Sequence, residues 1–275
     1  MAETSTPDTD VIIVAHNAGS LLEEAVASAI GQAGAGSVWV MDAESTDGSV
    51  AALQDDAPGI HIVPVPNLGF AAANNRGIEL TRSPFVVLLN PDAALRPGAL
   101  DALLTTADAH PRVGVVGALL VNADGSVQAN SFGRFPSLGT ALRLRWWRMV
   151  QRLRGNTSLS PAAPASTAEV DWVSGAAMLV RRTAIEDAGP MDEGFFLYYE
   201  DTEWCHRMRE HGWEVLLEPK ARVTHHLGGS AAPKAEIARA YRASFYRYCD
   251  LHGLWGLKSL SRLGLCLRRL VGGAP

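Results

Sequence analysis

The sequence predicts an α/β fold with a mostly parallel central sheet, helices on both faces and a helical C-terminal extension. Short apolar runs alternate with amphipathic segments of helical length, the pattern of a parallel sheet covered by helices. Polar residues follow each of the first four apolar runs. The chain has 275 residues, of which 47% are hydrophobic, enough for a large core.

The first half of the chain contains the regular alternation and ends near Val121. The expected strands are 11–15, 38–41, 60–63, 85–89 and 113–121, and the expected helices are 20–30, 71–80 and 97–110. The last of these helices has a proline in its first turn. Asp124-Gly125 is a turn signal after the final strand.

The second half opens after a segment rich in Ser, Thr, Pro and Ala, Asn156 to Ala168, which we interpret as a loop. We expect strands at 177–180 and 215–217, and helices at 183–188, 201–211, 235–252 and 254–270. Gly212 is a typical C-terminal stop for the helix before it. The two last helices form the predicted C-terminal extension.

Cysteine usage and the N-terminus favour a cytoplasmic protein. Cys205, Cys249 and Cys266 have neither metal-ligand spacing nor a disulfide framework, which is typical of a reducing compartment. The polar start, Met1 to Ser5, does not have the pattern of a signal peptide. No apolar run reaches the length of a membrane span.

The charge is unevenly distributed. The net charge is −5, yet Thr140 to Gly155 carries five arginines and no acid, and Leu251 to Pro275 carries four basic residues and no acid. The rest of the chain therefore carries −14. An acidic body with two basic segments does not indicate a nucleic-acid-binding protein. It indicates two local contacts with an anionic surface.

Both basic segments have an amphipathic helical pattern. In the first, apolar and basic residues occupy different faces: Leu142, Trp146, Met149, Val150 and Leu153 against Arg145, Arg148 and Arg152. In the second, the corresponding sets are Leu260, Leu263, Leu267 and Leu270 against Lys258, Arg262 and Arg269. Tryptophans beside arginines suit a helix lying in a membrane interface. We expect peripheral contact with the inner face of the cell membrane; packing on the body or in a homodimer is the alternative.

Asp92 is the first candidate site residue. The apolar run Phe85 to Leu89 leads directly into Asn90-Pro91-Asp92, and Asn-Pro is a stop and turn signal. Asp92 thus follows the carboxyl end of a buried strand, where open α/β sheets bind ligands. A carboxylate there can bind a divalent cation that carries a phosphorylated substrate. The alternative is a helix cap in a strand-to-helix turn.

The three preceding strands also end in polar residues. His16-Asn17 follows the first, Asp42 to Ser49 the second, and Asn67 to Phe70 the third, with Asn74 and Asn75 a helical turn further on. A nucleotide needs such groups for its base, ribose and metal-bound diphosphate. Individually, Ser45 and Asp47 could cap a helix that starts near Gly48, and Asn67 to Gly69 could be only a turn.

The ordered set of segments resembles the family-2 glycosyltransferases, which have a nucleotide-sugar-binding fold called GT-A. The matching segments are 11–17, 42–49, 67–77, 90–92, 172–182, 195–201 and 225–230. The sequence is most similar to the bacterial rhamnosyltransferases that act on lipid-linked or cell-wall glycan acceptors. A dehydrogenase is disfavoured because the first strand does not lead into a G-x-G-x-x-G turn.

The resemblance implies a GT-A domain over 1–232 and the helical extension over 233–275. Within the domain, 10–121 would bind the nucleotide sugar and 170–232 would supply the acceptor and catalytic half. The implied activity is inverting transfer of L-rhamnose from dTDP-L-rhamnose to a polyprenyl-diphosphate-linked saccharide, with Mg²⁺ or Mn²⁺. UDP-galactofuranose or UDP-GlcNAc as donor, and a non-catalytic nucleotide-sugar-binding protein, are the alternatives.

The resemblance also implies roles in donor binding. Asp42 would contact the base, and Asp92 would bind the metal as the last residue of the family's D-x-D element. Asn90 stands where that element often has its first Asp, which leaves one negative charge fewer. The implied donor-binding residues are Ala15, Asn17, Asp42, Ser45, Asp47, Asn67, Gly69, Phe70, Asn75, Asn90 and Asp92.

The remaining implied roles lie in the second half. Asp201 would be the catalytic base, with Glu200 raising its pKa by like-charge repulsion and the helix N-terminus opposing that effect. His225 would contact the metal or diphosphate, because it has the family's H-x-x-G-x-S spacing, and His226 is the rival. Trp172, Ser174 and Gly175 would line the acceptor or sugar pocket, although Trp172 could be a core residue instead.

Overall fold

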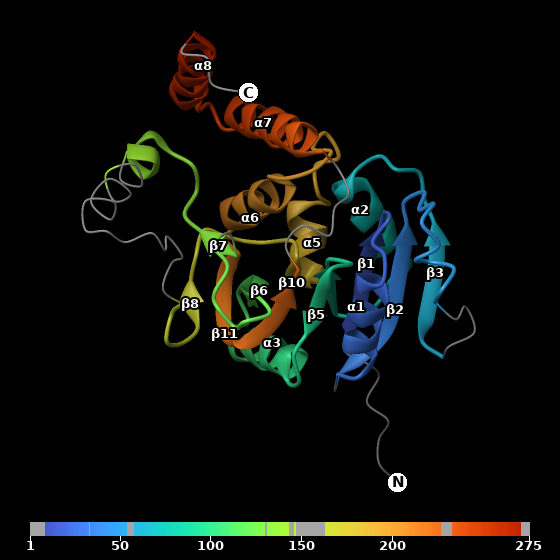
Figure 1. Ribbon diagram of the computed structural model, residues 1–275. Coiled ribbons are helices and arrows are strands. Elements are labelled where there is room, and N and C mark those ends of the chain that lie inside the picture. Colours follow the sequence, from blue (N-terminus) through green and yellow to red (C-terminus); the bar gives the residue numbers. More distant parts are fainter. Residues whose placement is uncertain are drawn as a thin grey trace.

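The computed structural model describes residues 9–32, 34–53, 58–129, 131–142, 146, 163–226 and 233–270. Within them, a central sheet has the strand order β3-β2-β1-β4-β10-β6-β11-β5, and β8 pairs with β11 outside this path. Helices lie on both faces of the sheet, and the last two helices lie together above it (Figure 1). The expected α/β class, with a flanked central sheet and a helical C-terminal extension, is confirmed.

The strands follow the apolar runs closely. Their bounds are β1 Thr9–Ala15, β2 Ala35–Asp42, β3 Ile60–Pro64, β4 Phe85–Leu89, β5 Ala93–Leu95, β6 Val113–Val121, β7 Phe132–Gly133, β8 Ala168–Glu169, β9 Trp172–Val173, β10 Ala177–Arg181 and β11 Glu214–His225. β7 and β9 form a separate two-stranded sheet. The main strands β4 and β6 are buried along their whole length, which explains their unbroken apolar sequences.

The helices begin and end within a few residues of the predicted positions. Their bounds are α1 Leu21–Ile30, α2 Phe70–Leu80, α3 Ala99–Ala109, α5 Arg182–Ala188, α6 Glu200–Glu210, α7 Lys234–Leu251 and α8 Trp255–Leu270. Residues 48–53 form turns rather than the helix considered near Gly48. Among the described residues, no helix combines the length and apolar character that crossing a bilayer requires.

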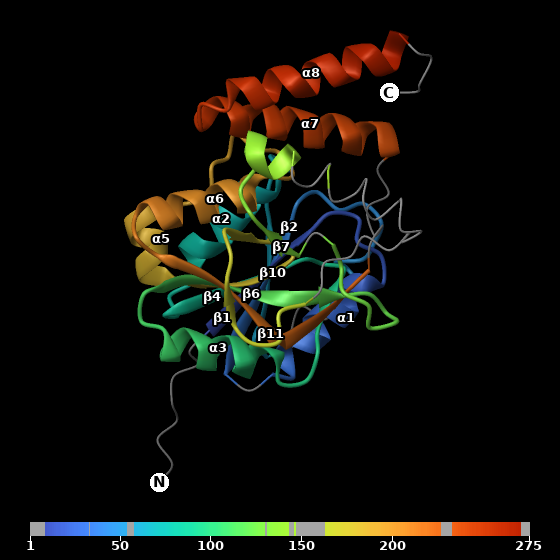
Figure 2. The ribbon, with the colours of Figure 1, turned by 90° about the vertical axis from the view of Figure 1, so that its left-hand side faces the viewer.

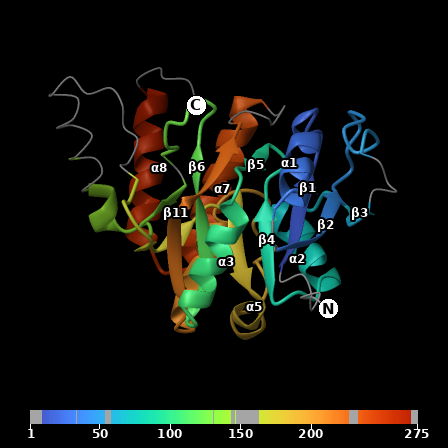
Figure 3. The same ribbon diagram turned by 90° about the horizontal axis from the view of Figure 1, so that it is seen from below.

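Two apolar clusters hold the helices on the sheet. One packs α1 and α3 against one face through residues such as Leu22 and Leu103. The other packs α2, α5 and α6 against the opposite face, where Trp204 is fully buried. Alternate residues of β1 divide between the two clusters, as the two-residue period of a strand requires. Figure 3 shows these layers from below.

The direction of β10 decides where the second half of the chain meets the first. β1, β2, β3 and β4 are mutually parallel, whereas β10 is antiparallel to both of its neighbours, β4 and β6. β6 and β11 return to the common direction, and β5 and β8 oppose it. Since β10 runs backwards, its amino end lies beside the carboxyl end of β4.

β11 is much longer than the predicted strand at 215–217. It continues past a register irregularity at Glu218/Arg222 and reaches His225. Its polar residues, Lys220 and Arg222, conceal this continuation in the sequence. The extra length pairs with β5, a strand that was not predicted, and brings His225 opposite Ala93.

Helix α7 packs against the segment that precedes α6. Arg247 forms a salt bridge with Asp192 at 2.8 Å, and the Ser244 hydroxyl donates to the Leu197 carbonyl at 2.7 Å. Figure 2 shows α7 and α8 lying together on the α6 side of the molecule.

The predicted boundary between the GT-A domain and the C-terminal extension, at 232/233, stays a prediction. Of the first basic segment, the description includes only 140–142 and the exposed Trp146; its arginines lie outside the described residues.

Candidate active site

The loops after β1 and β2 hold each other through polar side chains. The Asn17 amide oxygen accepts from the Thr46 backbone at 2.8 Å, and the Asn17 backbone donates to the Ser45 hydroxyl at 3.2 Å. Asp47 accepts from the Gly19 backbone at 2.9 Å and from the Ser49 hydroxyl at 2.6 Å. The Ser49 hydrogen bonds lower the pKa of Asp47 most, and the Gly19 bond adds to that effect. These side chains therefore lie close together, and some of their polar atoms are already used in hydrogen bonds between the two loops.

Asp42 lies at the centre of this edge. It ends β2 in register with Ala15, the buried last residue of β1. One carboxylate oxygen, Oδ1, accepts from the Ser45 backbone at 2.9 Å. Oδ2 has no hydrogen bond to the described residues. Asp42 is thus a half-buried carboxylate with one oxygen free for a ligand, as a base contact requires.

Gly69 allows the donor loop to contact the second half of the chain. Its φ is +109°, and a Cβ at this position would lie 2.5 Å from the Phe196 carbonyl oxygen. That carbonyl accepts from the Phe70 backbone at 2.9 Å. A larger residue at position 69 would therefore force the loop away from Phe196. Asn67 lies two residues before Gly69, in the middle of the loop between β3 and α2.

Asn75 contacts residues 191–193 in the second half of the chain. Its amide nitrogen donates to the Met191 carbonyl and to Glu193, both at 2.9 Å, and its oxygen accepts from the Met191 backbone at 3.0 Å. Asn75 is 5% exposed. Both amide hydrogens and one acceptor position of the amide oxygen thus hold residues 191–193, and the direct contact of Asn75 with the donor stays a prediction.

A line of backbone contacts connects Asn90 to Asp201. Leu89 is paired with Ala177, so the loops beyond these residues lie side by side, and the Asn90 backbone donates to the Ala176 carbonyl at 2.9 Å. The adjacent Gly175 backbone donates to Asp201 Oδ2 at 2.9 Å. The antiparallel insertion of β10 thereby places the predicted metal loop and the predicted base at the same edge of the sheet.

His225 points at Asp92. Its Nε2 lies 3.2 Å from Asp92 Oδ1, and both side chains are largely buried. His226 lies instead near α1, with Nε2 3.6 Å from Glu24, and only its backbone contacts Asp92. Of the two rival histidines, the structure brings His225 to the predicted metal loop.

Gln128 determines which nitrogen of His225 faces Asp92 with a free lone pair. The Gln128 amide nitrogen donates to the His225 carbonyl at 2.7 Å and to Asn122 Oδ1 at 2.9 Å, so the amide oxygen must face the ring. That oxygen lies 2.9 Å from His225 Nδ1, which therefore carries a proton. Nε2 then turns its lone pair toward the Asp92 carboxylate, so the two groups are placed to hold a cation between them.

Asp201 and Glu200 begin α6 and differ in their surroundings. Burial raises the pKa of Asp201 above its ordinary value of 3.8, and hydrogen bonds from Gly175 and Thr202 oppose the rise. Burial, and secondarily the charge of Asp201, raises the pKa of Glu200 well above 4.5. Glu200 is 4% exposed, and its Oε2 has no partner among the described residues. Asp201 is therefore the carboxyl group that loses its proton at the lower pH. Like-charge repulsion between the two groups raises chiefly the pKa of Glu200.

The comparison with known families agrees with this geometry. The family model described as "Glycosyl transferase family 2" matches residues 10–168, which include every strand end of the first half. The chain belongs to glycosyltransferase family 2. The resemblance inferred from the sequence is thus confirmed, and the molecule is a glycosyltransferase.

Two curated relatives of this glycosyltransferase come from Mycobacterium tuberculosis. One, named N-acetylglucosaminyl-diphospho-decaprenol L-rhamnosyltransferase, is 32% identical over 269 residues, covering 89% of this chain and 85% of the relative. Another, named pre-mycofactocin glycosyltransferase, is 31% identical over 248 residues, covering 83% of this chain and 47% of the relative.

Two solved structures share the fold. GalNAc-T7, solved with UDP, GalNAc and Mn²⁺, gives a TM-score of 0.63 at 16% identity, over 82% of this chain and 44% of that one. The mannosyltransferase PcManGT from Pyrobaculum calidifontis, solved with GDP-Man and Mn²⁺, gives 0.56 at 17% identity, over 96% of this chain and 81% of that one. These likenesses confirm the expected GT-A fold.

The predicted acceptor-pocket residues of the glycosyltransferase have mainly packing contacts. The Trp172 indole nitrogen donates to the Arg134 carbonyl at 3.1 Å, and its ring packs over Gly133 on β7. Trp172 as a whole is half-buried. The Ser174 hydroxyl accepts from the Ala176 backbone at 3.2 Å. Ser174 shapes the loop, and Gly175 gives Phe70 and Asp201 room on either side.

Two residues of the site were not found from the sequence. Gln128 follows the predicted turn at Asp124-Gly125, but nothing local connects it with His225. Tyr198 has a φ of +69°, and Tyr199 has one of +68°, unfavourable values for two successive aromatic residues. Burial raises the pKa of Tyr198, and the charges of Glu200 and Asp92 raise it further.

Replacing Gln128 by leucine should weaken metal binding by about 10–100-fold, the usual effect of removing a group that orients a metal-binding histidine. Leucine has a similar volume but cannot accept the hydrogen bond from His225 Nδ1. Titration with Mn²⁺ in the presence of nucleoside diphosphate measures the change. Asn122→Leu, which removes only the far end of the same network, is the matched control. Equal metal affinity in the Gln128 variant and the wild type would show that His225 needs no such orientation.

Proposed function

We propose that this glycosyltransferase moves L-rhamnose from dTDP-L-rhamnose to a polyprenyl-diphosphate-linked saccharide, with inversion and with help from Mg²⁺ or Mn²⁺. The single observation that carries the chemistry is the convergence of Asp92–His225 and Asp201 on adjoining loops. The rhamnose donor and lipid-linked acceptor rest on the 32% identity to the decaprenol-linked rhamnosyltransferase, which extends over 89% of this chain.

The residues present fit a divalent metal. Asp92 and His225 supply a carboxylate oxygen and an imidazole nitrogen 3.2 Å apart, and Gln128 orients the imidazole from its other nitrogen. Asn90 is a neutral residue on the same loop, so the diphosphate oxygens would contribute much of the negative charge around the ion. A bound metal would stabilise the charge that develops on the departing diphosphate. Mn²⁺ in the two structural neighbours supports this assignment.

Asp201 would act on the acceptor. In a single displacement, Asp201 takes the proton of the acceptor hydroxyl while that oxygen bonds to the anomeric carbon of the donor sugar. The bond from the anomeric carbon to the diphosphate oxygen breaks, and the nucleoside diphosphate leaves with the bonding electrons. The Gly175 and Thr202 hydrogen bonds hold the carboxylate in position for this transfer. Glu200 stays protonated beside it and avoids a second buried charge.

The other half of the site would hold the nucleotide. Asp42, with its free Oδ2, is placed to accept from the base, and the hydrogen-bonded loops that contain Asn17, Ser45 and Asp47 surround it. Gly69 and Phe70 would line the same site next to Phe196.

Turnover of a synthetic polyprenyl-diphosphate-GlcNAc acceptor with a panel of nucleotide sugars tests the proposed donor and acceptor. Transfer from UDP-galactofuranose or UDP-GlcNAc, but not from dTDP-L-rhamnose, would overturn the donor assignment.

We also propose that helix α8 contacts the cytoplasmic face of the membrane. Leu260 is 47% exposed, Leu263 57% and Trp255 70%, and the helix is rich in basic residues. A helix with exposed apolar side chains and basic charge suits the interface of an anionic bilayer. This contact would bring the site to a lipid-linked acceptor.

Exchanging Leu260 and Leu263 together for serine should reduce binding to phosphatidylglycerol-containing liposomes by at least about tenfold, because each fully buried leucine is worth about 1.5–3 kcal/mol. Sedimentation measures the bound fraction. Ile30→Ser is the matched control, since Ile30 on α1 has a similar exposure of 46%. If the wild type ignores the liposomes, and the double variant instead converts a dimer to a monomer, the apolar surface is a subunit contact.

A further inference from the structure

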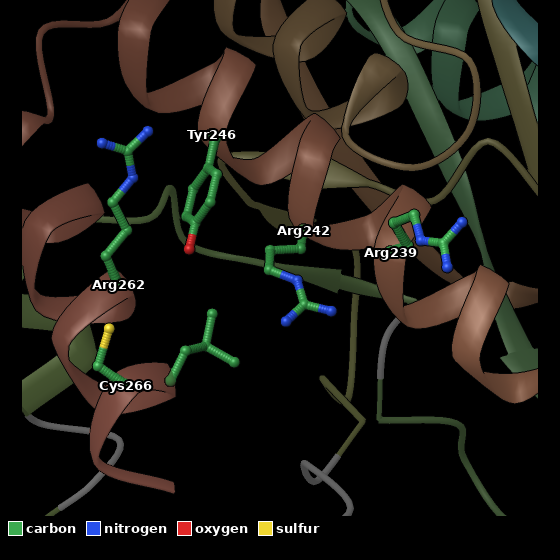
Figure 4. A pocket seen from close by; sticks show the side chains of 6 residues that line it. Arg239, Arg242, Tyr246, Arg262 and Cys266 are labelled. Carbon is green, nitrogen blue, oxygen red and sulfur yellow. The ribbon is translucent and has the colours of Figure 1, made fainter. Parts of the chain in front are cut away.

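A cavity of about 460 Å³ lies between α7 and α8, away from the Asp92 and Asp201 loops. Its lining residues come from both helices: Arg239, Arg242, Tyr246, Arg262, Leu265 and Cys266. The volume is in the range of small-molecule sites, about 300–1,000 Å³. Figure 4 shows Tyr246, Arg242 and Arg262 around this space, whereas the guanidinium of Arg239 is directed away from it. The proposed transfer reaction does not use these residues.

The arginines carry positive charge without a protein counterion. In the described part of the chain, Arg239, Arg242 and Arg262 form no salt bridge, and Arg262 lies over the Tyr246 ring at 5.2 Å. The helix pair contains two acidic residues, Glu236 in the first turn of α7 and Asp250 near its end. Asp250 is bound by Lys258, and Glu236 has no ion pair with a described residue. Like charges gathered around one cavity repel each other, and an anion between them would remove that repulsion.

Tyr246 supplies a second, independent observation. Its hydroxyl is buried and has no hydrogen-bond partner among the described residues. Figure 4 shows this hydroxyl directed into the space between Arg242 on α7 and Arg262 on α8. A buried phenol normally has a partner. The position therefore needs an acceptor oxygen, and the surrounding guanidinium groups select one that carries negative charge.

We propose that this cavity binds the phosphate group of an anionic membrane lipid. Phosphate oxygens accept from guanidinium groups in paired geometry and from a phenol, so one group satisfies both observations. Leu265 and Cys266 form an apolar wall for the glycerol and the first acyl carbons. The lipid source of the phosphate rests on the proposed membrane contact of α8, whose exposed Leu263 follows Arg262 directly.

The site is separate from catalysis because it uses the opposite side of α7. Tyr241, Ser244 and Tyr248 recur at helical spacing and face the segment before Asp201 and α6: Tyr241 meets Tyr199 at 3.1 Å, and Tyr248 meets His206 at 2.9 Å. Arg239, Arg242 and Tyr246 occupy the side toward α8. Binding in the cavity can thus be measured without sugar transfer.

Protection of Cys266 from alkylation tests the proposal on the unmodified full-length protein. Cys266 is exposed and lines the cavity, whereas Cys205 and Cys249 are buried. Dihexanoyl phosphatidylglycerol, kept below its micelle concentration, should slow the alkylation of Cys266 by iodoacetamide at least about fivefold. Mass spectrometry measures the rate of this alkylation. Dihexanoyl phosphatidylcholine and inorganic phosphate at the same concentration should protect much less. No protection by the anionic lipid overturns the site, and equal protection by inorganic phosphate makes it a free-anion site.

Substitutions separate this pocket from diffuse charge. Arg242→Gln should raise the half-protecting concentration of phosphatidylglycerol about fivefold, the effect of one basic residue at an anionic surface. Tyr246→Phe, which removes no charge, should raise it a few-fold. Arg112→Gln removes one charge at a distant exposed salt bridge and should change nothing. An equal effect of Arg112→Gln, or none of Tyr246→Phe, overturns the pocket. Persistent liposome sedimentation without Cys266 protection would reject the pocket and leave the membrane contact standing.

Discussion

Asp201→Asn should lower the rate of sugar transfer by about a hundredfold or more and leave nucleoside diphosphate binding nearly unchanged, because the base acts in the chemical step. In the wild type, both carboxylate oxygens of Asp201 accept hydrogen bonds from backbone N–H groups, those of Gly175 and Thr202. An amide keeps only one of these acceptors, so thermal unfolding and diphosphate calorimetry must accompany the kinetics. Transfer at more than about a tenth of the wild-type rate would exclude Asp201 as the base.

The pH dependence gives the same hypothesis a second readout. Since burial raises the pKa of Asp201 above 3.8, the base is protonated and inactive at low pH. The transfer rate of the wild type should therefore fall as the pH decreases through this raised pKa, at a higher pH than for an ordinary aspartate. A profile that stays flat down to pH 4 would contradict a base with a raised pKa.

Glu200→Gln is the matched control, the same acid-to-amide exchange one residue earlier. The pKa of Glu200 is raised well above 4.5, so its carboxyl stays protonated in the pH range where Asp201 titrates, and glutamine resembles that neutral form. We expect activity within a few-fold of the wild type and an unshifted acid limb. A loss as large as that of Asp201→Asn would show that the two carboxyl groups act as a unit.

Asp92→Ala should weaken binding of the nucleoside diphosphate and abolish its dependence on metal together. Asp92 and His225 face the same position, and removing the carboxylate takes away the charge that holds a divalent ion there. Calorimetry of dTDP binding with and without Mg²⁺ or Mn²⁺ measures both effects, and we expect a loss of about a hundredfold in the presence of metal. Equal enhancement by metal in the variant and the wild type would show that Asp92 is not a ligand.

Adjacent histidines provide the control for this experiment. His225→Ala should cause a milder form of the same defect, because its Nε2 points at Asp92. His226→Ala should leave metal-dependent binding intact, because its side chain lies near Glu24 on α1. If His226→Ala shows the defect and His225→Ala does not, the ion lies on the other side of the loop.

Much of the fold and part of the site are determined by local sequence. The unbroken apolar runs at 85–89 and 113–121 match buried strands β4 and β6 residue for residue, because a strand covered on both faces has no polar position. Asp42 and Asp92 could be assigned to one edge because parallel strands bring their carboxyl ends together. The resemblance then connected that edge with Asp201.

Tertiary structure decided how the second half completes the site. The apolar sequence of β10 does not reveal that it inserts antiparallel between β4 and β6, yet this direction places Gly175 between Asn90 and Asp201. The amide of Asn75 is used by residues 191–193, which no local pattern indicates.

The sequence by itself therefore determined the α/β class, the strand ends that carry polar groups and the family. Only the three-dimensional structure decided that His225 rather than His226 meets Asp92, that Gln128 sets its tautomer, and that Tyr246 faces an arginine-lined cavity. The physical reason is the range of the interactions. Hydrophobic periodicity and turn chemistry act between near neighbours in the chain, whereas these contacts join segments whose meeting depends on strand direction, register and helix packing.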